Sequence, residues 1–333
     1  MTKRLAEVAK KAGVSEATVS RVLNGRSGVS EATRASVLTA LDVLGYERPT
    51  KLRGERGRLV GLVLPELQNP IFPALAEVVT ASLAQRGFTP ALCARTIGGV
   101  PESDYIEMLL DHQVSGVVFA GGSYALAAAD HGHYRQLLDR RMPVVMVNAG
   151  VDGLGFPHIS TDDAVAVEQA YGHLRSLGHE RIGLVLGPED HIPSRRKLAA
   201  VAKLAGWDRP DEWVERTNFS MESARLAAAR LIQRGITGMI CVSDVVALGS
   251  IRAARRLGLD VPGDVSVVGF DDSALMTCTD PPLTTVRQPI EMMGQAAVDL
   301  LVNQIEGSGV QPDELLFEPE LVVRGSTGPA KAS

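Results

Sequence analysis

The 333-residue sequence is poor in cysteine, in aromatic residues and in long apolar runs. Its three cysteines, Cys93, Cys241 and Cys278, form no CxxC pair, which argues against a disulfide framework or a zinc cluster; we expect three buried apolar thiols. No apolar run approaches the roughly 18 residues that cross a bilayer, and charges interrupt the amino-terminal segment where a signal peptide would be apolar. The sequence therefore predicts a cytoplasmic protein without membrane contact.

Short enzyme motifs are also missing from this sequence. It contains no GxSxG, P-loop or HExxH pattern, and Gly121 and Gly122 do not form a GxGxxG fingerprint. The seven histidines show no metal-ligand spacing. We therefore predict no catalytic residue, no metal and no cofactor.

Charge is distributed unevenly along the chain. Residues 1–58 hold 12 Lys and Arg against 6 Asp and Glu, a net charge of +6, whereas the remainder carries −11 within the total of −5. A basic segment on an acidic body favours contact with a polyanion. The alternative is a basic surface without a partner.

Uninterrupted apolar runs alternate with amphipathic segments after residue 58. The run 59–65 predicts a strand, and 70–87 predicts a helix that ends at a glycine; further strand-like runs are 115–122, 142–149, 181–188, 238–244 and 265–272. Continuous apolarity indicates strands covered on both faces, as in parallel α/β sheets. Because the runs are too many for one sheet, we predict two doubly wound parallel-sheet subdomains with a ligand cleft between them.

The first residues have the pattern of a helix-turn-helix. Apolar residues at helical spacing predict a first helix up to Ala12, and Gly13 with Val14 predicts a tight turn. Ser15 is a good N-cap for a second helix, which we expect to end at Leu23. A third amphipathic helix is predicted over residues 31–44, which makes an all-α head.

The second helix is predicted to read DNA bases from its open face. We expect Arg21 to pair with guanine and Ala17 to touch a thymine methyl group, with Ser20 beside them. Glu16 either accepts from a cytosine amino group or selects against other bases. Hydroxyl and amide groups suited to phosphate oxygens are Ser15, Thr18, Asn24, Ser30 and Thr33. The alternative is that the Ser and Thr residues only cap helices.

Several motifs resemble one known family. The head resembles that of lactose-repressor (LacI/GalR) family transcription regulators in the segments AGVSEATVSRVLNG and VSEATRASVLTALDVLGYERP. The body is similar to the effector-binding core of that family in VSDVVALGSIRAARRLGLDVPGDVSVVGFDD and DPPLTTVRQP. The resemblance covers residues 2 to about 327. It implies a homodimeric repressor whose core is similar to periplasmic sugar-binding proteins and whose small-molecule effector alters affinity for operator DNA.

The segment GYERPTKLRGERGRLVGLVLPE resembles the subgroup that regulates the use of maltose and malto-oligosaccharides. We expect a head over 1–48, a hinge over 49–58, a first core subdomain over 59–159 and 288–317, a second over 160–287 and 318–327, and a tail over 328–333. Hinges of this family insert a leucine into the minor groove. Here the hinge is shorter and rich in Gly and Arg, which leaves Leu52 as the candidate wedge. The alternative is a flexible basic linker.

Polar residues follow the predicted strands at the edge where ligands of open α/β sheets bind. They are Gln68 and Asn69 with Phe72, Asn148, Arg195 to Lys197, Asn218 with Phe219, Ser243 with Asp244, and Asp271 with Asp272. Amides, carboxylates and cations can bridge adjacent hydroxyls, and an aromatic face can cover a pyranose. This combination predicts a sugar site.

By motif match, the family's effector contacts fall on Asn69, Phe72, Lys197, Phe219, Ser243 and Asp271. Lys197 stands where arginine is usual, and Ser243 where asparagine is usual, so different hydroxyls would be recognised. The alternatives are that Asp271 caps a turn, that Lys197 is a solvated helix charge and that Phe72 packs in the core.

Two other classes of protein share parts of this pattern. A solute-binding transport protein would share the core but should carry a secretion signal and no basic helical head. A nicotinamide or phosphotransfer enzyme should carry a glycine fingerprint or metal carboxylates. The sequence favours a regulator of transcription, and it leaves open whether the effector releases or strengthens DNA binding.

Overall fold

A computed structural model describes residues 2–23, 28–44, 58–96, 98–151, 153–309 and 311–331. The chain divides into two units, Met1–Arg58 and Leu59–Ser333, which are described separately. Asn24, Leu52 and the expected hinge up to residue 57 lie outside the described residues.

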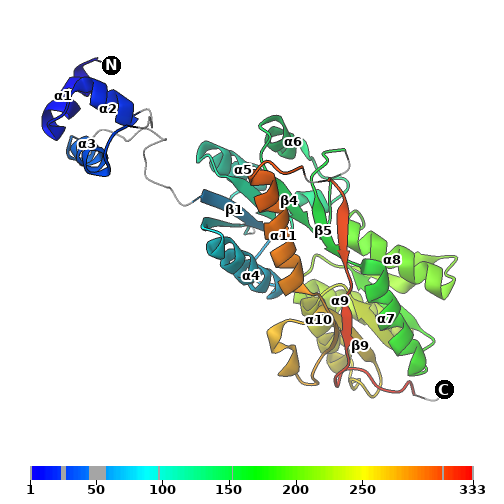
Figure 1. The fold of residues 1–333 in the computed structure, drawn as a ribbon. Helices are drawn as coiled ribbons and strands as arrows, with labels where there is room; N and C mark the ends of the chain where they lie inside the picture. The colour runs from blue at the N-terminus through cyan, green and yellow to red at the C-terminus, as the bar shows by residue number, and fades with distance from the viewer. Residues whose placement is uncertain are drawn as a thin grey trace. The chain divides into compact units, whose positions relative to one another are not determined.

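The described residues of the first unit form three helices around a small apolar core (Figure 1). These helices are α1 (Thr2–Ala12), α2 (Glu16–Leu23) and α3 (Glu31–Val43). Val19 and Val22 of α2 are fully buried against Val8 and Val37. Gly13, at φ 68°, makes the turn between α1 and α2 in a conformation that glycine adopts without strain. The predicted helix-turn-helix is therefore confirmed.

The second unit contains two six-stranded sheets. The first sheet has the order β11-β5-β4-β3-β1-β2 and the second β12-β10-β9-β8-β6-β7. The strands of the first sheet are β1 (Arg58–Leu64), β2 (Phe88–Ala94), β3 (Gly116–Phe119), β4 (Val144–Val147), β5 (His158–Thr161) and β11 (Glu314–Phe317). Those of the second are β6 (Ile182–Leu186), β7 (Val214–Arg216), β8 (Gly238–Cys241), β9 (Ser266–Asp271), β10 (Thr284–Arg287) and β12 (Glu320–Val322).

Helices cover both faces of the first sheet because successive strand residues point to opposite sides. In β3, Val118 packs toward α4 and α11, whereas Val117 and Phe119 pack toward α5 and α6. The helices are α4 (Ile71–Gln85), α5 (Glu102–Asp111), α6 (Gly132–Asp139) and α11 (Ile290–Ile305). This two-sided burial explains why the strands are apolar throughout.

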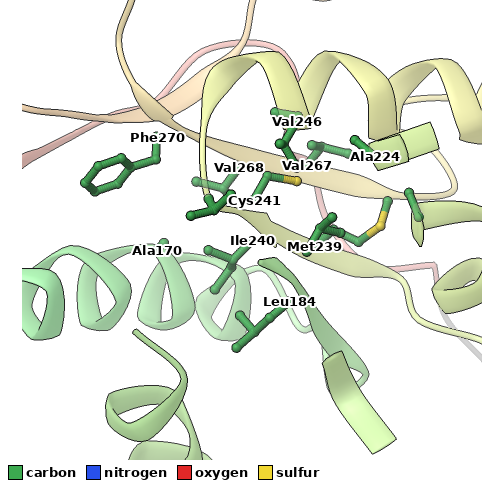
Figure 2. Close-up of a cluster of buried hydrophobic side chains, with 14 of the residues drawn as sticks. Ala170, Leu184, Ala224, Met239, Ile240, Cys241, Val246, Val267, Val268 and Phe270 are labelled. Carbon is green, nitrogen blue, oxygen red and sulfur yellow. The ribbon is translucent and has the colours of Figure 1, made fainter. Parts of the chain in front are cut away.

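The second sheet is covered in the same way. Its helices are α7 (Asp163–Ser176), α8 (Ile192–Ala205), α9 (Met221–Gln233) and α10 (Asp244–Arg256). Figure 2 shows Ala170 of α7 and Val246 of α10 on opposite sides of the strands that carry Ile240 and Val268. Three short 3-10 turns complete the structure: Ser123–Ala125, Pro210–Trp213 and Ala274–Thr277. The predicted α/β fold with two doubly wound sheets is confirmed.

The chain passes between the two sheets three times: after Thr161, after Arg287 and between Phe317 and Glu320. All three passages lie at the same end of the sheets, where β11, β5, β10 and β12 are found. We call this end of the core the hinge; it is distinct from the expected hinge over residues 49–58, which links the head to the core. Polar residues at the carboxyl ends of the strands of the two sheets meet beside the hinge, where Asn69 Nδ2 donates to Asp271 Oδ2 at 3.2 Å.

Two expectations need correction. The second sheet is not wholly parallel, because β12 pairs with β10 in antiparallel orientation at the sheet edge. Cys278 is exposed, whereas Cys93 and Cys241 are buried. Cys278 directly follows a 3-10 turn rather than a strand, so no sheet covers it. Among the described residues, none of the helices is both long and apolar enough to cross a membrane.

We expect two glycine-to-alanine substitutions in core helices to have opposite effects. A Cβ on Gly249 of α10 would overlap the backbone oxygen of Met221 and lie 2.7 Å from the Cβ of Ala224, so Gly249→Ala should lower the unfolding free energy by about 1 to 3 kcal/mol. Gly172 of α7 has open space around it, so Gly172→Ala should raise stability by up to about 1 kcal/mol. Urea unfolding of the full chain measures both. Equal effects would contradict the close approach of α9 and α10.

Candidate functional site

One exposed surface of the head is formed by α2. Glu16, Ala17 and Arg21 are exposed and Ser20 is half-buried, so these residues occupy roughly 140° of one side of the helix. Val19 and Val22 occupy the buried side. The four expected base-reading residues therefore share one open surface, as major-groove reading requires.

A hexapeptide, Gly-Val-Ser-Glu-Ala-Thr, occurs twice in the head, at 13–18 and at 28–33. In both copies the serine hydroxyl caps the following helix: Ser15 Oγ accepts from the N–H of Thr18 at 3.1 Å, and Ser30 Oγ from that of Thr33 at 3.2 Å. Each serine also hydrogen-bonds the threonine hydroxyl, at 2.9 and 2.8 Å. The capping alternative is thus realised in both.

The two capped helix starts line the same hollow of about 340 Å³. Its lining residues are Val14, Ser15, Thr18, Arg21, Gly28, Val29, Ser30 and Thr33. Helix N-termini carry partial positive charge and free N–H groups, which suit phosphate oxygens. Capping and phosphate contact are therefore compatible, and Arg21 adds a cation at the rim. The repeat is visible in the amino-acid sequence and could have indicated that the two helix starts are equivalent.

In the core, Asp271 is the most connected of the expected effector residues. It is 4% exposed, and its Oδ1 accepts from Gln288 Nε2 at 2.7 Å. Its Oδ2 accepts from Asn69 Nδ2 at 3.2 Å. Burial and the neighbouring charge of Asp244 raise the pKa of Asp271 well above its ordinary value. The structure therefore joins Asp271 of the second sheet to Asn69 of the first.

Gln288 extends this network to the hinge. Its Oε1 accepts from Thr161 Oγ1 at 2.8 Å and from Asn148 Nδ2 at 3.3 Å. Thr161 ends β5 and Gln288 follows β10, so two of the three passages between the sheets meet here. A single side chain, Gln288, thus connects Asp271 to the hinge.

Lys197 is not a solvated helix charge. Its side chain is 4% exposed, its ammonium pairs with the Asp163 carboxylate, and it lies 4.0 Å from the centre of the Phe270 ring. Burial raises the pKa of Asp163, although Lys197 and Arg196 oppose this effect. Asp163, which sequence reasoning missed, therefore orients Lys197. Its position as the first residue of a helix after a strand was the available signal.

The other expected residues have different surroundings. Ser243 is buried and caps α10 by accepting from the N–H of Val246 at 3.3 Å. Phe219 is half-buried, and its ring meets His191 edge-on with 5.0 Å between centres. Phe72 is half-buried on α4, and its N–H bonds the Asn69 carbonyl at 3.2 Å. Asp272 pairs with Arg287 and Arg324 instead of contacting Asp271's partners.

A serine, a histidine and a carboxylate meet in the first-sheet subdomain without forming a catalytic triad. His133 Nε2 lies 3.2 Å from Ser123 Oγ and 3.4 Å from Glu102 Oε1, so one nitrogen faces both partners. Ser123 Oγ also donates to the same carboxylate at 3.0 Å. A triad histidine uses its two nitrogens for two different partners. In the described residues we also find no group of three or more His, Cys, Asp or Glu placed to hold a metal ion.

Two protein families match the chain, one within each of its two folding units. Residues 4–49 match the family described as bacterial regulatory proteins, lacI family, and residues 171–327 match the periplasmic binding protein-like domain. The HTH-type transcriptional regulator MalR of Streptomyces coelicolor is 51% identical over 337 residues, which cover 99% of this chain and 98% of that protein. This chain belongs to the LacI family. It is a transcriptional regulator with a helix-turn-helix head and a periplasmic-binding-protein-like core.

Solved structures agree with this membership. The transcriptional regulator CelR in complex with cellobiose has 31% identity and a TM-score of 0.72, over 97% of this chain and 99% of that chain. The lac repressor dimer bound to operator and the anti-inducer ONPF has 29% identity and a TM-score of 0.71, over 96% of this chain and 98% of that chain. The family resemblance drawn from the sequence is therefore confirmed.

Asp244 of this LacI-family regulator is fully buried beneath Asp271. It accepts from the N–H of Ser273 at 2.7 Å and from Thr285 Oγ1 at 2.6 Å. Burial raises the pKa of Asp244 to about 6. The folded protein therefore holds a proton that the unfolded chain has released, and the stability that this proton contributes is lost as the pH rises through 6.

We expect Asp244→Asn to remove this pH dependence. Asparagine keeps the shape and one acceptor oxygen but does not titrate. Relative to the wild type, the unfolding free energy of the variant should rise between about pH 4 and about pH 7, by up to about 3 kcal/mol. Urea unfolding at both pH values measures the difference. A difference that stays constant with pH would show that Asp244 ionises as an ordinary aspartate.

Proposed function

We propose that this regulator is a homodimeric repressor whose affinity for operator DNA is controlled by a sugar bound between the two sheets of the core. The sugar is of the malto-oligosaccharide class. The protein acts in the cytoplasm and catalyses no reaction. We keep the domain limits expected from the sequence, in which the head covers residues 1–48 and the linking hinge covers residues 49–58.

The observation that carries the DNA part is the open surface of α2. Glu16, Ala17 and Arg21 are exposed on one side of a helix whose other side is the core of the head. Below them, two capped helix starts face one hollow and supply donors for phosphate oxygens. Arg21 reads guanine, and the phosphate contacts set the register.

The sugar part rests on the chemistry of the cleft. Asn69, Asp271 and Lys197 present an amide, a carboxylate and a cation, and Phe219 offers a ring. Such side chains bind hydroxyl groups and the apolar face of a pyranose. CelR, which is similar over nearly the whole chain, has been solved with cellobiose. Residues 45–66 resemble the subgroup that regulates the use of maltose and malto-oligosaccharides.

Control of DNA binding follows from the position of Asp271. A sugar hydroxyl that bonds Asp271 competes with Asn69 and disturbs a link between the two sheets. A ligand that binds one arrangement of the sheets more tightly shifts the population toward it, with a coupling of typically 1 to 3 kcal/mol. The sign of the shift decides between induction and co-repression.

The homodimer is supported by the lac repressor, which was solved as a dimer on its operator. On this chain, α9 leaves Met221 and Leu226 exposed, and a second copy would cover such apolar side chains. Two heads held by a dimer bind two half-sites of a pseudo-palindromic operator.

We expect Arg21→Ala to weaken binding to the operator by about 1 to 3 kcal/mol and to relax one base position. Arg21→Lys is the matched control, because lysine keeps the charge but loses the planar fork. It should lose base discrimination while its salt dependence stays close to that of the wild type. Gel-shift titration at graded salt, with a duplex from the upstream region of its own gene, measures both. Equal weakening on operator and random DNA would exclude direct reading by Arg21.

We expect Asp271→Asn to abolish stabilisation by sugar. Wild-type protein screened by thermal shift against maltose, maltotriose and cellobiose should melt higher with the effector, since only the folded state binds it. The variant should show no shift, because asparagine replaces one of the two carboxyl oxygens by an N–H donor. Asp104→Asn, at an exposed position of α5, is the control and should respond as the wild type does. A shift retained in Asp271→Asn would remove Asp271 from the site.

A further inference from the structure

The two core sheets also touch at a point away from the hinge. Residues 123–127, which follow β3, meet residues 190–191, which follow β6. Leu126 forms an antiparallel bridge with His191, and the N–H of Ala127 donates to the Asp190 carbonyl at 2.9 Å. β3 is the fourth strand from the hinge in the first sheet, and β6 is the fifth in the second. This contact therefore joins the two sheets at a second point, away from the hinge.

Residues 123–127 are held to the first sheet by Glu102, which is 5% exposed. Its carboxylate accepts from Ser123 Oγ at 3.0 Å, from the N–H of Ser123 at 3.3 Å and from the hydroxyl of Tyr134. Burial alone would raise the pKa of Glu102, but hydrogen bonds from His133, Tyr134 and Ser123 hold it below its ordinary value. An ionised acceptor thus fixes the start of the segment.

The approach of the segment to Glu102 requires glycine at position 122. A Cβ on Gly122 would lie 2.9 Å from the carboxylate carbon of Glu102 and would overlap the carboxylate. His131 fixes the segment from the other side, because its Nε2 lies 3.1 Å from both the Ser123 and Leu126 carbonyls. With these bonds made, the N–H of Ala127 points to the other sheet.

His191, which pairs with Leu126 in the bridge, lies next to the expected effector residue Phe219. His191 caps α8, and its ring meets Phe219 edge-on. Burial and the charge of Lys197 lower the pKa of His191 to about 3, so the ring is uncharged. A contact with His191 therefore bears directly on the aromatic side of the cleft.

We propose that residues 123–127 form a clasp that holds the two sheets together away from the hinge, and that Glu102 is the positioning residue that keeps the clasp in its closed shape. The clasp slows release of the effector, a role that rests on the proposed sugar-binding function. The closing contact itself does not depend on that function.

Hydrogen exchange of the full chain without sugar tests the contact. Ala127→Pro removes the N–H that donates to Asp190, whereas Ala127→Ser at the same position keeps it. Amide exchange over residues 187–192 should be at least about tenfold faster in Ala127→Pro than in the wild type or Ala127→Ser. Equal exchange in all three proteins would overturn the clasp.

Glu102→Gln tests the positioning role with a second change. The glutamine amide would place its own N–H donors next to the donors of Ser123 and Tyr134. Amide hydrogen exchange over residues 187–192 should therefore again be faster than in the wild type. Glu107→Gln, on the exposed side of the same helix, is the matched control and should leave exchange unchanged. If Glu102→Gln behaves as the control while Ala127→Pro does not, the clasp stands and the role of Glu102 falls.

Stopped-flow binding of maltotriose measures the effect on the effector. Ala127→Pro should raise the dissociation rate about tenfold and change the association rate little, a pattern that general loss of folding would not produce. An unchanged dissociation rate would overturn the retention role. If maltotriose does not bind the wild type, the proposed sugar fails, and the exchange result still decides whether the clasp closes.

Discussion

A carboxylate buried away from water must find hydrogen-bond donors, and Asp271 finds them on both sides of the hinge. Asn69 donates from the first sheet and Gln288 from a passage between the sheets. A buried charge that loses its donors costs several kcal/mol. Movement of one sheet relative to the other therefore has to exchange one set of donors for another, which favours a few discrete arrangements over continuous bending.

The neighbouring charges make this constraint stronger. Asp244 and Lys197 both act electrostatically on Asp271, and the Lys197 ammonium pairs with a further buried carboxylate, Asp163. The cluster thus has more acceptors than cations. Sugar hydroxyls are neutral donors and add hydrogen bonds to such acceptors without adding charge. For the proposed effector site, this surplus of acceptors favours a polyol over an anion.

In the head, two helices begin with the same hexapeptide. The same six residues start α2 and α3, and each copy uses its serine for the same cap. Local interactions within four residues are enough to make these helix starts, so their positions could be predicted from the letters alone. Exposure of Glu16, Ala17 and Arg21 followed from the same periodicity, because Val19 and Val22 had to be inside.

The sequence by itself determined the elements and the class of fold. Strands covered on both faces must be apolar throughout, and helices must repeat their apolar residues every three or four positions, so both patterns are local. It also placed polar residues such as Ser243 and Asp271 at the carboxyl ends of their strands. It did not reveal that Cys278 is exposed, that β12 is antiparallel or that Asp163 holds Lys197, since each depends on neighbours distant in the chain. Asn69 and Asp271 are 202 residues apart, and only the tertiary structure decides that their side chains meet, because burial of one charge selects its donors in space without regard to their order.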